Sequence, residues 1–197
     1  TRTSVVADTQ DGSLSLSAEF NQTALLKDVW SERFLHININ APIRPATDVA
    51  KGVNIAILMD VSGSMSSEGK LDYAKYATKW LASQLNEKDS FSLTTFADDA
   101  RTIVPLQPVS EVPNLEFIID SINEGGGTNL YDGIVTATEA FLTNQPNQNI
   151  NRLIILSDGK ANIGPSDSAS LYSVAATAAN TGVTISTIGL GRDFNER

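Results

Sequence analysis

Three oxygen-bearing side chains lie close together in residues 60–64 of the sequence. Asp60, Ser62 and Ser64 alternate with a valine and a glycine, and Gly63 allows the chain to turn sharply, so the three side chains can converge from one loop. One carboxylate and two hydroxyls are hard oxygen ligands, which suit a small divalent cation that keeps several waters. The segment therefore predicts part of a metal site that other residues must complete.

Two residues elsewhere in the chain are candidates for completing this site. Thr128 follows a run of three glycines, and Asp158 follows the strand-like run 153–157. Each stands where an apolar run ends or a helix begins, which is where ligand-binding loops lie at the carboxyl edge of an open α/β sheet. Without these partners, a simple turn at the end of a strand would be the better interpretation of residues 60–64.

The elements that position these residues alternate between strands and helices. Apolar runs predict strands at 53–59, 90–96, 101–106, 152–157 and 183–190. Helical spacing predicts helices over 69–85, 112–122, 130–141 and 168–180. Prolines place the strand at 101–106 on an edge. The alternation is typical of an α/β fold with a doubly wound, mostly parallel sheet, here with one antiparallel edge strand.

Residues 1–48 follow a different pattern. Alternation over 13–20 predicts one strand, and a second strand would place Leu35, Ile37 and Ile39 on one face. Two isolated strands are marginal in water, so we expect the pair to pack against another part of the protein. Two prolines and Gly52 then mark a linker. We predict a β extension over 1–48 and the main domain over 49–197.

Composition narrows the classes of partner. The net charge of −9 argues against nucleic acid and anionic membrane surfaces. The chain has no cysteine, which excludes disulfides and thiolate metal sites. No apolar run approaches the length that spans a bilayer.

The candidate ligands resemble the metal-ion-dependent adhesion site of von Willebrand factor type A domains, over roughly residues 51 to 197. All five positions are filled in the family's order: Asp60, Ser62, Ser64, Thr128 and Asp158. The resemblance implies a site for Mg²⁺ or Mn²⁺, or for Ca²⁺, in which Ser62 and Ser64 bind directly and the aspartates often act through water. It further implies a Rossmann-like fold and a protein partner that presents an Asp or Glu side chain to the ion.

The same resemblance sets expectations for the rest of the chain. The N-terminal strands resemble those of bacterial proteins in which a type A domain is inserted into a β-sandwich. In the family another strand and a terminal helix normally follow, so we expect the domain to be truncated at its C-terminus. The implied role is adhesion or protein binding without catalysis, outside the cell or in its envelope.

Two other functions remain open. The domain could be a scaffold subunit of a larger ATPase or of an envelope assembly. A metal-dependent phosphatase would use Asp60 as nucleophile, but Ser62 stands where such enzymes usually carry a second acid. Phosphate-loop and dinucleotide motifs are incomplete at residues 63–70 and 189–194.

Three further features have simpler structural interpretations, and a possible second metal site is incomplete. We expect His36 on a solvated strand face, and the acidic pair Asp98-Asp99 in a solvated turn. The stripe of Tyr73, Ala77 and Trp80 predicts packing in the core or at an interface. Residues 66–68 lack the acidic pair of a second metal site.

Overall fold

The computed structural model describes residues 5–8, 15–20, 34–40, 51–143, 149–159 and 161–192. The chain divides into two compact units, Thr1–Ala50 and Lys51–Arg197. The assignment of residues 1–48 to part of a β-sandwich stays a prediction.

The described residues of the first unit form three antiparallel strands in the order β1-β2-β3. They are β1 (Val5–Asp8), β2 (Ser15–Phe20) and β3 (Leu35–Asn40). The sequence pattern predicts β2 and β3 but misses β1, because its four residues are too few to show a period. Pairing with β1 gives β2 a neighbour on each side.

The apolar face of β3 is exposed among the described residues, and the expected packing of this face against another part of the protein stays a prediction. Leu35, Ile37 and Ile39 are 49%, 52% and 64% exposed. Alternation correctly predicts that these side chains share a face, but it does not determine whether another element packs on that face. His36 on the opposite face is exposed, as predicted.

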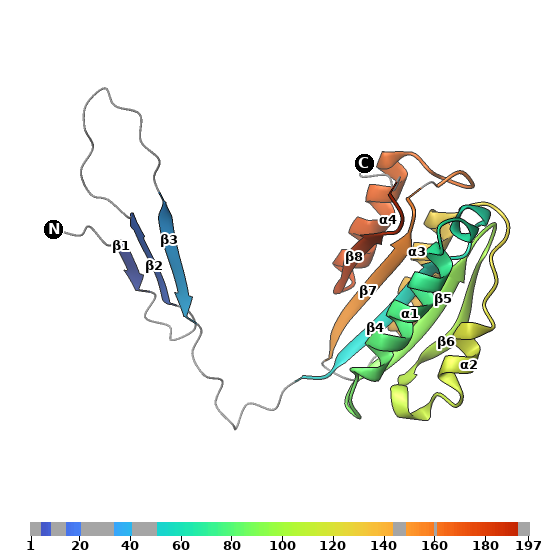
Figure 1. The fold of residues 1–197 in the computed structure, drawn as a ribbon, viewed down its shortest axis with the longest axis horizontal. Helices are drawn as coiled ribbons and strands as arrows, with labels where there is room; N and C mark the ends of the chain where they lie inside the picture. The colour runs from blue at the N-terminus through green and yellow to red at the C-terminus, as the bar shows by residue number, and fades with distance from the viewer. Residues whose placement is uncertain are drawn as a thin grey trace. The chain divides into compact units, whose positions relative to one another are not determined.

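The second unit contains a five-stranded sheet in the order β6-β5-β4-β7-β8 (Figure 1). Its strands are β4 (Val53–Asp60), β5 (Ser90–Phe96), β6 (Ala100–Pro108), β7 (Ile150–Ser157) and β8 (Val183–Gly189). All neighbouring pairs are parallel except β5 and β6. The predicted fold class, a mostly parallel sheet with one antiparallel edge strand, is confirmed.

Helices cover both faces of this sheet. The first face packs against α1 (Lys70–Ser83) and α2 (Leu115–Asp120), and the second against α3 (Leu130–Thr143) and α4 (Ser168–Asn180) (Figure 1). The single helix predicted near 112–122 is instead a 3₁₀ turn (Val109–Glu111) followed by the short α2. Among the described residues, no helix is long and apolar enough to cross a membrane.

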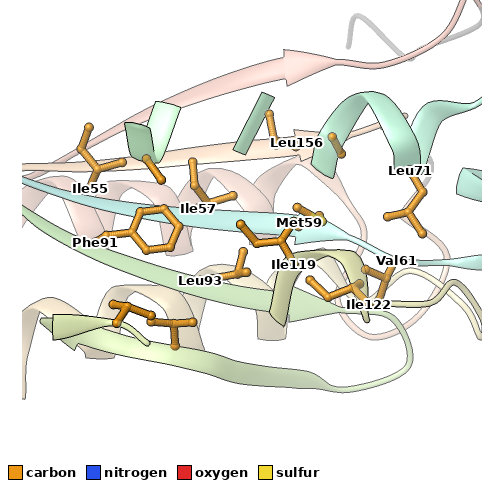
Figure 2. Close-up of a cluster of buried hydrophobic side chains, with 14 of the residues drawn as sticks. Ile55, Ile57, Met59, Val61, Leu71, Phe91, Leu93, Ile119, Ile122 and Leu156 are labelled. Carbon is orange, nitrogen blue, oxygen red and sulfur yellow. The ribbon is translucent and has the colours of Figure 1, made fainter. Parts of the chain in front are cut away.

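The core is organised around β4, whose side chains are buried on both faces of the sheet. Figure 2 shows Ile55, Ile57 and Met59 of β4 packed with Phe91 and Leu93 of β5, under α1 and α2. The intervening residues of β4 pack on the opposite face against α3. A parallel strand buried in this way needs a continuous apolar run, which is why the sequence predicts it well.

The exposed side of α1 departs from one prediction. Leu71, Ala74 and Thr78 are buried as the helical spacing predicts. Tyr73 and Trp80, however, are 66% and 58% exposed, so they do not pack in the core, and packing at an interface stays a prediction. Their spacing matches a helix face but does not distinguish a core face from a surface face.

Candidate metal centre

Three loops at the carboxyl edge of the sheet carry the five predicted ligands. Asp60 ends β4 and is followed by a 3₁₀ turn (Gly63–Ser66) that contains Ser64. Thr128 lies just before α3, and Asp158 follows directly after β7. Because β4 and β7 are parallel neighbours, both aspartates emerge at the same edge of the sheet.

Main-chain hydrogen bonds join the first two loops. The Gly63 N–H donates to the Gly126 carbonyl at 3.0 Å, and the Gly125 N–H donates to the Val61 carbonyl at 2.8 Å. Gly126 has a φ of 82°, and a Cβ there would lie 2.9 Å from Asp98 Oδ2. A side chain at this position would therefore be strained by the positive φ and would force the Asp98 carboxylate to shift.

Asp60 is fully buried, and both of its carboxylate oxygens accept hydrogen bonds from neutral donors. Oδ1 accepts from the Ser62 N–H at 2.9 Å, and Oδ2 accepts from Ser157 Oγ at 2.6 Å. Burial raises the pKa of Asp60, the hydrogen bonds from Ser157 and Ser62 oppose that rise, and the nearby charge of Asp158 adds to it. The carboxylate is thus well oriented but poorly solvated.

Asp158 is also fully buried, yet its two oxygens have different surroundings. Oδ2 accepts from the Lys70 ammonium at 3.2 Å, in an ion pair whose side chains are 3% and 0% exposed. Oδ1 is buried and has no hydrogen-bond partner among the residues that the structure describes. An unpartnered buried carboxylate oxygen is costly and calls for an explanation such as a bound ion or water.

The candidate hydroxyl ligands lie in loops that are held by hydrogen bonds. Ser62 Oγ and Ser64 Oγ are 3.1 Å apart, so they face each other across the loop. Thr128 is 2% exposed, and its main chain is held on both sides by Asn162. The Thr128 N–H donates to Asn162 Oδ1 at 2.8 Å, and the Asn162 N–H donates to the Thr128 carbonyl at 3.0 Å. The loop after β7 therefore fixes Thr128 as well as Asp158.

Four residues that support the site are not predicted as part of it. They are Lys70, Asp98, Ser157 and Asn162. Asp98 is exposed, as expected of a turn, but its Oδ1 also accepts the Gly127 N–H at 2.7 Å. Asp98 and Ser157 follow or end predicted strands at the same sheet edge, and this position could have indicated them. No sequence signal identifies Lys70 or Asn162.

The residues present fit a hard divalent cation. Among the described residues no three His, Cys, Asp or Glu side chains form a cluster, so the candidate ligands are two carboxylates and three hydroxyls. That set suits Mg²⁺, which keeps several of its waters and needs only one or two carboxylates. The free Oδ1 of Asp158 is available to such an ion or to one of its waters.

Comparison with known proteins agrees with this architecture. The family model of the von Willebrand factor type A domain matches residues 54–197. The chain is 31% identical over 170 residues to the uncharacterized protein YfbK of Escherichia coli, covering 85% of the chain and 29% of YfbK.

Solved structures share the fold. The conserved hypothetical protein BatB from Bacteroides thetaiotaomicron has a TM-score of 0.61 at 26% identity, over 70% of this chain and 66% of that chain. A von Willebrand factor type A protein from Catenulispora acidiphila has a TM-score of 0.65 at 19% identity, over 94% of this chain and 38% of that chain.

The chain spans only 29% of the length of its relative YfbK. Two further relatives are calcium-activated chloride channel regulator 1 of Bos taurus and inter-alpha-trypsin inhibitor heavy chain H3 of Homo sapiens, which are 27% and 24% identical over 78% and 72% of this chain and 17% of each relative. At a coarse level, the family and these relatives support protein interaction as the general role of the domain. The family match covers most of the chain and includes all three loops described above. This chain belongs to the von Willebrand factor type A domain family.

Proposed function

We propose that this domain is a metal-dependent protein-binding module that recruits an Asp or Glu side chain of a partner protein. Asp60, Ser62, Ser64, Thr128 and Asp158 would hold one Mg²⁺ or Mn²⁺, directly or through water. The ion would supply an electrophilic position for an external carboxylate. The role is recognition without turnover.

The observation that carries this proposal is the unsatisfied carboxylate oxygen of Asp158. It is fully buried beside a second buried carboxylate, Asp60, whose pKa is raised mainly by burial and to a lesser extent by the charge of Asp158. The Lys70 ammonium compensates one of these two carboxylates, so one buried negative charge and one unpartnered carboxylate oxygen remain, which is unfavourable. A divalent ion would compensate the remaining charge.

A pocket beside the same loops supports a protein ligand. It has a volume of about 380 Å³ and is lined in part by Val61, Asp98, Arg101, Ile103 and Ile122. Val61 belongs to the loop between Asp60 and Ser62, so the pocket adjoins the candidate site. Its mixed charged and aliphatic lining suits side chains that flank an acidic residue in a partner protein.

Calorimetric titration of Mg²⁺ into chelator-stripped protein tests the proposal. We expect one saturable site in the wild type, weakened at least about tenfold in Asp60→Ala and in Ser64→Ala because each removes an oxygen ligand. Circular dichroism would verify that both variants fold.

Ser66→Ala is the matched control. It removes a hydroxyl from the same 3₁₀ turn, but this hydroxyl is not a candidate ligand. Ser66 Oγ instead donates a hydrogen bond to the Gly63 carbonyl. This variant should bind Mg²⁺ as the wild type does. Equal binding by all four proteins, or binding by none, would contradict the proposal.

A further inference from the structure

Lys70 is a buried cation at the centre of the candidate site. It is the first residue of α1, and its side chain is 3% exposed. Its ammonium lies 3.2 Å from Asp158 Oδ2, while Asp158 Oδ1 is left without a hydrogen-bond partner. The pair therefore neutralises Asp158 without occupying both of its oxygens.

Charge counting shows what this arrangement does to a bound ion. The buried carboxylates of Asp60 and Asp158 together carry two negative charges, which alone would cancel a divalent cation. With the ammonium of Lys70 included, the site carries one negative charge without the ion and one positive charge with it. A net positive site attracts a further carboxylate, whereas a neutral one does so much less.

We propose that Lys70 sets the charge of the metal site, weakening the hold on the cation but leaving it electrophilic toward a carboxylate of the partner. Lys70 is thus a positioning and specificity-determining residue that acts through Asp158. The inference rests on the proposed metal-dependent function.

The proposal predicts effects of opposite sign when the charge is removed. In Lys70→Gln the ammonium is replaced by a neutral amide that can still donate a hydrogen bond to Asp158. Divalent cations should then bind more tightly, since repulsion is lost, and carboxylates should bind the loaded site more weakly. A purely structural role for the ion pair would instead weaken both kinds of binding together.

The experiment uses the chain of 197 residues with Mn²⁺ as the probe ion and acetate as the probe carboxylate. Electron paramagnetic resonance of free Mn²⁺ gives the metal affinity. Water proton relaxation of the Mn²⁺-loaded protein, titrated with acetate, gives the carboxylate affinity. For Lys70→Gln we expect about tenfold tighter Mn²⁺ binding and about tenfold weaker acetate binding.

Lys79→Gln is the matched control, because Lys79 lies on the same helix in an exposed ion pair with Asp120 at 2.7 Å. Both affinities should match those of the wild type. Weaker or unchanged binding of both probes by a folded Lys70→Gln variant would overturn the inference. Should that variant not fold, Lys70→Arg decides, because it keeps the charge: unchanged affinities support the inference, and loss of both overturns it.

The same data separate this inference from the proposed function. Failure of the proposed function would appear as a wild-type protein that binds no Mn²⁺ or binds it equally well as Asp60→Ala. Failure of the inference alone would leave the wild type with specific Mn²⁺ binding. In Lys70→Gln, however, the Mn²⁺ affinity and the acetate affinity would not change in opposite directions.

Discussion

The two ends of the central sheet bury carboxylates in contrasting ways. At the amino end, Asp89 is 6% exposed, and each of its oxygens accepts one main-chain N–H, from Val53 and from Asn86, both at 2.9 Å. At the carboxyl end, Asp60 and Asp158 are fully buried close to each other, and one oxygen of Asp158 has no partner.

The difference separates a carboxylate whose oxygens are both satisfied by the chain from a pair of carboxylates that is not fully satisfied. All three aspartates are buried, so burial alone does not distinguish Asp89 from the pair Asp60 and Asp158. Asp89 is satisfied by the chain itself and holds the start of β4 in place. Asp60 and Asp158 at the other end carry buried negative charge that the chain does not fully satisfy. Such charge is typical of ligand-binding sites.

The largest expected effect comes from breaking the buried ion pair at the carboxyl end. Asp158→Asn removes the carboxylate that the buried Lys70 ammonium contacts, so we expect the metal-free protein to lose about 3 kcal/mol of its free energy of unfolding. Urea unfolding in the presence of a chelator measures the loss. A change below about 1 kcal/mol would mean that the pair contributes as little as a surface ion pair.

A smaller effect is expected at the amino end. Asp89→Ala leaves the main-chain N–H groups of Val53 and Asn86 without their acceptor, at a cost of about 2 kcal/mol. Mg²⁺ affinity should not change, because this residue lies at the opposite end of β4. Reduced Mg²⁺ affinity in a folded Asp89→Ala protein would show that the two ends are not independent.

The smallest effect concerns pH. Burial raises the pKa of Asp60, so in the metal-free protein its favourable contribution is complete below the unfolded pKa and is lost as pH rises through the folded pKa. The stability of the wild type relative to Asp60→Asn should therefore fall as pH increases from about 4, the ordinary aspartate pKa. Urea unfolding at a series of pH values in chelator measures this slope, and a relative gain in stability with pH would contradict it.

The fold is predictable from sequence where burial forces a pattern on the chain. β4 needs a continuous apolar run because both faces are covered, and α1 shows its buried face in Leu71, Ala74 and Thr78. Prediction fails where tertiary context decides. β1 is too short to show a period, and the exposure of Ile37 and Trp80 depends on whether any element covers them.

The candidate site is predictable to a similar extent. The spacing of Asp60, Ser62 and Ser64 in one loop is a local pattern, and the sequence displays it directly. Lys70 and Asp158, which form an ion pair, are 88 positions apart in the sequence. Asn162 and Thr128, which are hydrogen-bonded, are 34 positions apart. Only the folded chain brings such pairs together.

The mutual hydrogen bonding of the three loops has a consequence for protein engineering. The loop of Asp60 is bonded to the glycine run at 125–127, and Thr128 at the end of that run is bonded to Asn162. Grafting only the five candidate ligand residues onto another scaffold would therefore not transfer the candidate site. The smallest transferable module is all three loops together with Asp98, Ser157 and Asn162, the side chains that hold them in register.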